Sequence, residues 1–183
     1  MPGGFSLSIT VSVEAATNLP GGGWSLRYEL RGDLDALLIP TPVAPGPADG
    51  LWQHTCFEAF VGPSGSLAYQ EFNFSPSGQW ASYLFSDERV RDTVSESAQA
   101  TTSNSQPSVA WHCFPDAFVL EACIPVAALR STGSRETLDV GLTAVIESRD
   151  HELTYWALRH PCAKPDFHNR QGFALQIPPK PNA

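Results

Sequence analysis

Apolar and polar residues alternate at the start of the chain, over residues 5–14. The apolar positions of this stretch are Phe5, Leu7, Ile9, Val11 and Val13, and a Ser, Thr or Glu residue follows each of them. In an extended strand every second side chain points to the same face, so these apolar residues share one face. The pattern therefore predicts a half-buried β-strand over 5–14.

Nine further strand-like runs follow this first one at short intervals. Turn-forming segments rich in Gly, Pro and Ser, such as 21–23 and 75–78, separate several of them. We expect an irregular excursion over 91–108, one helical turn over 125–129 and an irregular segment over 160–170, with no sizeable helix. The predicted strands cover 24–31, 55–61, 67–74, 79–85, 108–114, 118–124, 138–149, 152–158 and 172–177.

Short strands broken this often by turns are typical of an all-β, antiparallel β-sandwich of the immunoglobulin-like or jelly-roll type. The chain of 183 residues is long enough for a two-layer core, and its 14 Gly and 16 Pro suit many turns better than long helices. The Pro- and Gly-rich loop over 40–50 is too short and too central to be a linker. We therefore expect residues 1–183 to form a single domain.

Charge and hydropathy argue against two classes of partner. The formal net charge is −8 and the 11 Lys and Arg residues are scattered, whereas nucleic-acid binding depends on clustered cations. No apolar run approaches the roughly 20 residues of a membrane-spanning helix. We expect a small-molecule ligand as the partner, and neither nucleic acid nor a membrane.

The N-terminus and the cysteines both favour a cytoplasmic protein. The first residues lack the basic start and the continuous apolar block of a signal peptide. Cys56, Cys113, Cys123 and Cys162 form no CxxC pair, so we expect reduced thiols that pack as small apolar residues. The same spacing does not favour a zinc site.

Strand parity gathers polar side chains on one face of the predicted sheet. Glu58 lies on the opposite face from Phe57, and Glu71 and Asn73 lie on the opposite face from Phe72. If these two strands are paired neighbours, the two glutamates and the asparagine share one polar surface. The hairpin over 138–158 offers more polar residues, and we expect some of them to converge on that surface.

Aromatic residues near these strands favour a ligand site over a merely solvated sheet face. An antiparallel sheet often has one wet face that carries residues such as Glu147 and Arg149 without any function. Trp52, Trp80 and Trp156 change that balance, because Trp is costly to leave exposed without a stacking partner, although each one taken alone is more often a core residue. Planar rings together with acids and amides suit the recognition of a polyol.

The segment from His160 to His168 is dense in polar chemistry. His160, Asp166 and His168 could be metal ligands or a proton-transfer pair, or could pin the loop through hydrogen bonds to its own backbone. The absence of HxH and HExxH spacing favours the pinned loop, and we expect no metal. The chain has no GxSxG elbow, and Glu58 with Glu71 could serve glycoside hydrolysis only at a set separation.

Three motifs of the chain resemble those of bacterial DOMON-like domain proteins, relatives of carbohydrate-binding module family 9 and of cytochrome DOMON sandwiches. The motifs are LWQHTCFEAF at 51–60, EFNFSPSGQW at 71–80, and YWAL at 155–158 followed by PDFH at 165–168. The resemblance implies a sandwich whose ligand, a sugar or a haem, lies against one sheet. Met1 is the only methionine, which excludes a Met–His haem site but leaves bis-His and His–Lys ligation open.

The sequence thus predicts a non-catalytic binding domain for a small carbohydrate-like or other polar ligand, with no cofactor. Two alternatives stay open: a haem-binding electron-transfer or sensor domain using His160 or His168, and a glycoside hydrolase using Glu58 and Glu71. The predicted ligand-binding residues are Trp52, Glu58, Glu71, Asn73, Arg149, Trp156, His160 and His168.

Overall fold

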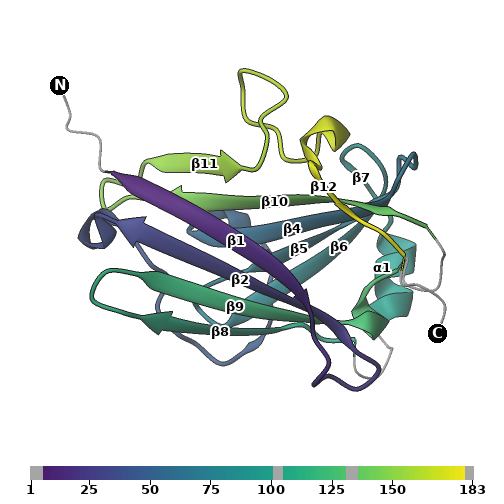
Figure 1. Ribbon diagram of the computed structural model, residues 1–183, viewed down its shortest axis with the longest axis horizontal. Coiled ribbons are helices and arrows are strands. Elements are labelled where there is room, and N and C mark those ends of the chain that lie inside the picture. The colour runs from purple at the N-terminus through teal and green to yellow at the C-terminus, as the bar shows by residue number, and fades with distance from the viewer. Residues whose placement is uncertain (1–5, 101–104, 131–135, 180–183) are drawn as a thin grey trace.

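Two β-sheets pack face to face in the structure, a computed structural model that describes residues 6–100, 105–130 and 136–179 (Figure 1). The smaller sheet contains, in spatial order, β1 (Leu7–Ala15), β2 (Gly23–Gly32), β9 (Phe118–Pro125) and β8 (Ser108–Cys113). The larger sheet contains, in spatial order, β11 (Leu153–Ala157), β10 (Leu138–Glu147), β4 (Cys56–Pro63), β5 (Tyr69–Phe74), β6 (Gln79–Asp87) and β3 (Gly46–Pro47). Two short strands flank it: β12 (Leu175–Ile177) pairs with β10, and β7 (Val90–Arg91) pairs with β6.

Pairing is antiparallel throughout the described residues except between β3 and β6. The architecture confirms the predicted all-β sandwich. The first strand also follows its predicted pattern, since exposed Ser and Thr residues alternate with half-buried apolar ones from Leu7 to Val13. Phe5, at the start of the predicted strand, lies outside the described residues.

The main core lies between the two sheets. Leu26, Tyr28 and Leu30 of β2 point into it from the smaller sheet, and Phe57 and Phe72 point into it from the larger one. Ladders with a period of two deliver these side chains from both sides, which is the usual construction of a sandwich. One hydrogen bond crosses the core, because the hydroxyl of Tyr28 donates to the backbone carbonyl of Glu58 at 2.8 Å.

The larger sheet is covered on its outer face as well, the face that points away from the smaller sheet. Residues 158–174, which we call the C-terminal segment, cross this face and bring Phe167 and Phe173 against Phe60, with ring centroids 6.4 and 5.7 Å away. As a result, β4 and β5 are buried along almost their entire length on both faces. Side chains that strand parity assigns to a polar face are therefore removed from water.

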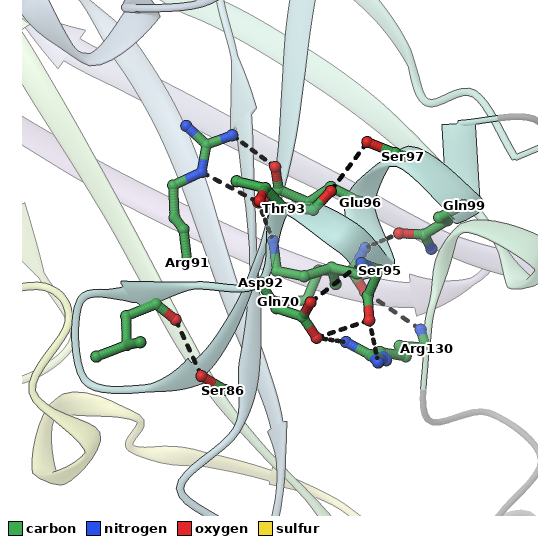
Figure 2. Close-up of polar contacts among 12 residues, drawn as sticks. Gln70, Ser86, Arg91, Asp92, Thr93, Ser95, Glu96, Ser97, Gln99 and Arg130 are labelled. Atoms are coloured by element: carbon green, nitrogen blue, oxygen red, sulfur yellow. Dashed lines mark hydrogen bonds and ion pairs between the residues drawn. The ribbon is translucent and has the colours of Figure 1, made fainter.

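The region 91–108 differs from the irregular excursion that we expected, because it contains the helix α1 (Thr93–Ala100). Asp92 precedes the helix and accepts hydrogen bonds from the backbone N–H and the hydroxyl of Ser95 at 3.0 and 2.6 Å, so it acts as an N-cap (Figure 2). Arg130 donates to both Asp92 and Ser95, and Glu96 accepts from the backbone N–H of Leu84 on β6. The expectation was wrong because a local Asp–x–x–Ser cap outweighed the polar composition.

Short 3-10 helices connect several strands, at Leu34–Ala36, Leu51–Gln53, Val126–Ala128 and Arg170–Gly172. The third of them confirms the helical turn predicted over 125–129. Cys56 is buried as expected, but Cys113 and Cys162 are exposed, so these two thiols are not core residues. In the described part of the chain, no helix has the length and apolar character needed to cross a membrane.

Candidate functional site

A pocket of about 890 Å³ opens on the outer face of the larger sheet. It is roughly twice the volume of the next two hollows in the described residues, which measure about 450 and 430 Å³. Strands β4 and β5 provide its floor, and the turn at Leu51–Gln53 and the C-terminal segment provide much of its walls. The size and the mixture of aromatic and charged lining residues are typical of a small-molecule site.

Two carboxyl groups, of Glu58 and Glu71, form the polar floor of this pocket, and a fully buried amide supports them. Glu58 lies directly opposite Asn73 on β5 and opposite Thr143 on β10, so all three share the outer face. The Thr143 hydroxyl donates to Glu58 Oε2 at 3.1 Å, and Asn73 Nδ2 donates to Glu71 Oε1 at 2.9 Å. The prediction that Glu58, Glu71 and Asn73 share one face is therefore confirmed, and all three are buried.

Burial makes the two floor carboxyl groups difficult to ionise. The pKa of Glu58 lies well above its usual value, first because the group is buried and then because Glu71 is close. Burial also raises the pKa of Glu71, to about 7, while the hydrogen bond from Asn73 and the charges of Arg91 and Arg89 oppose the rise. Both floor carboxyl groups therefore lose their protons at higher pH than exposed acids do.

Aromatic side chains make up the walls. Trp52, on the turn at Leu51–Gln53, is 51% exposed, and Tyr155 on β11 is 44% exposed. Tyr155 packs against Phe167 with ring centroids 6.0 Å apart, and Tyr83 lines the pocket from β6. Two large rings left open to solvent beside a polar floor provide stacking surfaces for a ligand.

Three cations, Arg89, Arg91 and Lys164, lie around the pocket, and two of them are paired. Arg89 forms an ion pair with Asp166 at 2.7 Å. Arg91 forms one with Glu96 at 2.6 Å (Figure 2). Its guanidinium also stacks over the Tyr83 ring, 4.3 Å from the ring centroid. The paired arginines therefore act first as structural links between the sheet, α1 and the C-terminal segment.

His168 lies at the edge of the floor with a defined proton arrangement. The Tyr69 hydroxyl accepts from the backbone N–H of Arg89 at 3.1 Å and contacts His168 Nδ1 at 2.7 Å, so it donates to that nitrogen. Burial lowers the pKa of His168 to about 4, which keeps the ring neutral with its hydrogen on Nε2. This nitrogen faces Glu71 Oε2 at 3.8 Å.

Four of the eight predicted ligand-binding residues do not line the pocket: Asn73 is buried beside Glu71, and the other three lie away from it. Trp156 pairs with Ala144, a core residue, so its ring packs on the core side of the sheet and its neighbour Tyr155 points to the pocket. Arg149 lies beyond the end of β10 and donates from Nε to the carbonyl of Asp35 at 2.6 Å. His160 is exposed and contacts the Phe167 ring from outside the pocket, with ring centroids 6.3 Å apart.

The haem hypothesis gains nothing from these positions. His160 does not line the pocket, and the two ring nitrogens of His168 face Tyr69 and Glu71. A haem ligand needs a ring nitrogen that is free to reach the iron. Neither histidine offers one to this pocket.

A second polar cluster holds the turn that carries Trp52. The buried carboxylate of Glu147 contacts Nδ1 of His54 and Nδ1 of His151, each at 2.8 Å. Burial alone would raise the pKa of Glu147, but the hydrogen bonds from the two histidines outweigh it and lower that pKa. Across residues 6–100, 105–130 and 136–179, no group of three or more His, Cys, Asp or Glu side chains is arranged to hold a metal ion. The cluster therefore anchors His54, two residues after Trp52.

Sequence reasoning missed the aromatic partner Tyr155 and the cations Arg89, Arg91 and Lys164. Parity in β11 separates Tyr155 from Trp156, but the register of β11 against β10 decides which of the two faces the pocket. The cations come from the turn before β7, from β7 itself and from the C-terminal segment, whose placement depends on the tertiary fold.

The fold and the pocket together define a β-sandwich with a ligand-sized site on one sheet. Neither the protein-family models nor the curated proteins that were searched include a match to this sequence. Among solved structures, the chain is similar to a putative carbohydrate-binding protein from Bacteroides uniformis, with a TM-score of 0.64 and 17% sequence identity. The similarity covers 98% of this chain and 80% of the other, which supports the same fold over nearly the whole length.

Proposed function

We propose that this protein is a non-catalytic binding domain of the DOMON-like type, which holds a small carbohydrate-like or other polar ligand in the pocket over β4 and β5. The buried polar floor beneath open aromatic walls carries the proposal. Carboxyl and amide groups hydrogen-bond hydroxyls, and the rings of Trp52 and Tyr155 can stack on the apolar face of a sugar ring. The name given to the Bacteroides protein agrees with a ligand of this class.

The state of the two glutamates supports binding rather than hydrolysis. A retaining glycosidase needs one carboxylate that stays ionised as nucleophile and one acid that carries a proton, and an inverting one needs an ionised base in place of the nucleophile. Here burial raises the pKa of both Glu58 and Glu71, and no cation is bound directly to either carboxylate among the described residues. Burial therefore disfavours, in both groups, the ionised state that the second role requires.

A ligand panel read by thermal shift and calorimetry tests the proposal. We expect at least one member of a panel of mono- and disaccharides and sugar acids to raise the melting temperature at millimolar concentration. Trp52→Ala should weaken that binding roughly 10-fold or more, as expected for the loss of a stacking partner. Phe114→Ala is the matched control, since Phe114 is also 51% exposed but lies in the turn between β8 and β9.

Three results would count against the proposal. If no panel member changes the melting temperature, the proposed class of ligand is wrong. If the Trp52 and Phe114 variants weaken binding equally, the pocket is not the binding site. Turnover of aryl glycosides that disappears in both Glu58→Gln and Glu71→Gln would instead establish a hydrolase.

A further inference from the structure

The floor of the pocket contains more hydrogen-bond acceptors than donors. Thr143 and Asn73 Nδ2 each supply one donor, to Glu58 Oε2 and to Glu71 Oε1. Among the described residues, Glu58 Oε1 makes no hydrogen bond, and Glu71 Oε2 lies 3.8 Å from its nearest donor, His168 Nε2. Asn73 Oδ1 also has no partner there, but it is fully buried and Asn73 does not line the pocket. Two acceptor oxygens of the pocket floor, Glu58 Oε1 and Glu71 Oε2, therefore lack a donor.

A buried acceptor without a donor costs free energy, so two such oxygens on the pocket floor favour a ligand that brings donors. A neutral hydroxyl supplies one donor and adds acceptors of its own. A primary ammonium group supplies three donors, adds no acceptor and offsets the repulsion between two neighbouring carboxylates. It can therefore donate to both open oxygens of the floor at once.

From this donor deficit we infer that the pocket binds the protonated primary amine of an amino sugar or a closely similar polar amine, with the ammonium group seated on Glu58 and Glu71. The inference rests on the proposed function, because it names the ligand class of the same pocket. The walls fit a cation too, since Trp52 and Tyr155 expose ring faces that attract positive charge.

Two of the three cations around the pocket, Arg89 and Arg91, are already paired within the protein. Arg89 is held by Asp166 and Arg91 by Glu96, so each guanidinium is already neutralised by a partner. Both carry exposed side chains at the rim, whereas Glu58 and Glu71 are buried at the floor. Burial raises the pKa of both glutamates, and the charges of Arg91 and Arg89 oppose the rise at Glu71 only in part, so a ligand cation would add to this compensation.

Affinities for matched sugars show how much the amine contributes to binding and how much the sugar ring contributes. In calorimetry near neutral pH, the 2-amino, 2-hydroxy and 2-acetamido forms of the gluco, galacto and manno sugars are compared, with ethylammonium as a sugar-free amine. We expect the amino form of at least one series to bind roughly 10- to 100-fold more tightly than its hydroxy and acetamido forms, the range expected for charge-assisted hydrogen bonds. Ethylammonium alone should bind far more weakly.

Proton release provides a second readout. An ammonium bound at the floor favours the ionised form of Glu71, so amine binding should release protons, and the heat should change between buffers of different ionisation enthalpy. A neutral sugar should release fewer. Glu71→Gln and Glu58→Gln should each remove most of the preference for the amine, whereas Glu121→Gln, an exposed acid on β9, should keep it.

The possible failures are distinguishable. Equal affinity for amino and hydroxy forms would overturn the amine assignment and leave the proposed function standing. Equal binding of ethylammonium and the amino sugar would overturn the sugar component. A preference that survives in both folded glutamine variants would place the amine elsewhere, and no binding by any sugar or amine would overturn the inference together with the proposed function.

Discussion

Both sheets carry glutamates on their outer faces, but the pKa values of these glutamates are shifted in opposite directions on the two sheets. On the smaller sheet, Glu29 accepts from Arg27 and Arg31 at 2.5 and 2.6 Å, and these hydrogen bonds lower its pKa. On the larger sheet, Glu58 and Glu71 are buried and their pKa values are raised. The first face is an ordinary solvated surface and the second is a pocket floor.

The difference arises from the chain segments that pack over each outer face, and not from the strands themselves. Both faces place a glutamate on a central strand by the same period of two. Only the larger sheet has a C-terminal segment packed across it, with Phe167 and Phe173 against its strands. A glutamate in a strand is therefore informative about function only once it is known what covers it.

The largest expected effect is on the free energy of unfolding, when a buried side chain of the C-terminal segment is truncated. Phe173 is buried and packs against Phe60 and Tyr69, with ring centroids 5.7 Å away in each case. Phe173→Ala should lower the free energy of unfolding by about 3–5 kcal/mol, the usual cost of truncating a buried Phe. Urea denaturation measures this loss of free energy.

The same variant also tests the burial of the floor. If water then reaches the floor, NMR titration should show the pKa of Glu71 falling toward its usual value, and an unchanged pKa would contradict our account of the burial.

The next effect is on the pH dependence of stability. Because the folded pKa of Glu71 is about 7 and its usual value is 4.5, ionisation destabilises the fold as pH rises from 4.5 through 7. The loss amounts to about 3 kcal/mol when complete, at 1.36 kcal/mol per pKa unit. Glu71→Gln should remove this loss and leave the protein more stable at pH 8. The charged groups that face Glu71 are Glu58, Arg89, Arg91, Glu96 and His168.

A smaller effect concerns Asp92, a partly buried acid that forms the N-cap of α1. Asp92→Ala should cost about 1 kcal/mol, because it removes the N-cap of α1 and the ion pair with Arg130. Hydrogen exchange should show the loss in α1, while the floor strands β4 and β5 stay protected. Equal deprotection of α1 and β4 would mean that the helix is not a separate unit.

The smallest effect is expected on the solvated face. Glu29→Gln should leave the urea midpoint at pH 7 almost unchanged, because its ion pairs with Arg27 and Arg31 are exposed to solvent. Its pKa is lowered, so any stabilisation would be present above the usual value and lost as pH falls below it, the opposite direction to Glu71. A midpoint that shifts as much as in Glu71→Gln would remove the contrast between the two faces.

Much of the fold and part of the site were predictable from local pattern. The alternation in β1 and the parity of β4 and β5 place Leu7 to Val13 and Glu58, Glu71 and Asn73 correctly, because side-chain direction in a strand depends only on the count along the chain. Trp156 failed because parity within β11 says nothing about its register with β10. The burial of the acids also depends on residues 158–174, a long-range contact that no local pattern encodes.

The hydrogen bond from Tyr28 to the carbonyl of Glu58 links the pocket floor to the sheet behind it. The position of this glutamate therefore depends on β2 as well as on its own strand. Substitutions that shift β2, in the smaller sheet, should therefore change ligand affinity by moving Glu58, although the substituted residues do not contact the ligand. For protein engineering, this offers a way to adjust the site while every residue that lines it stays unchanged.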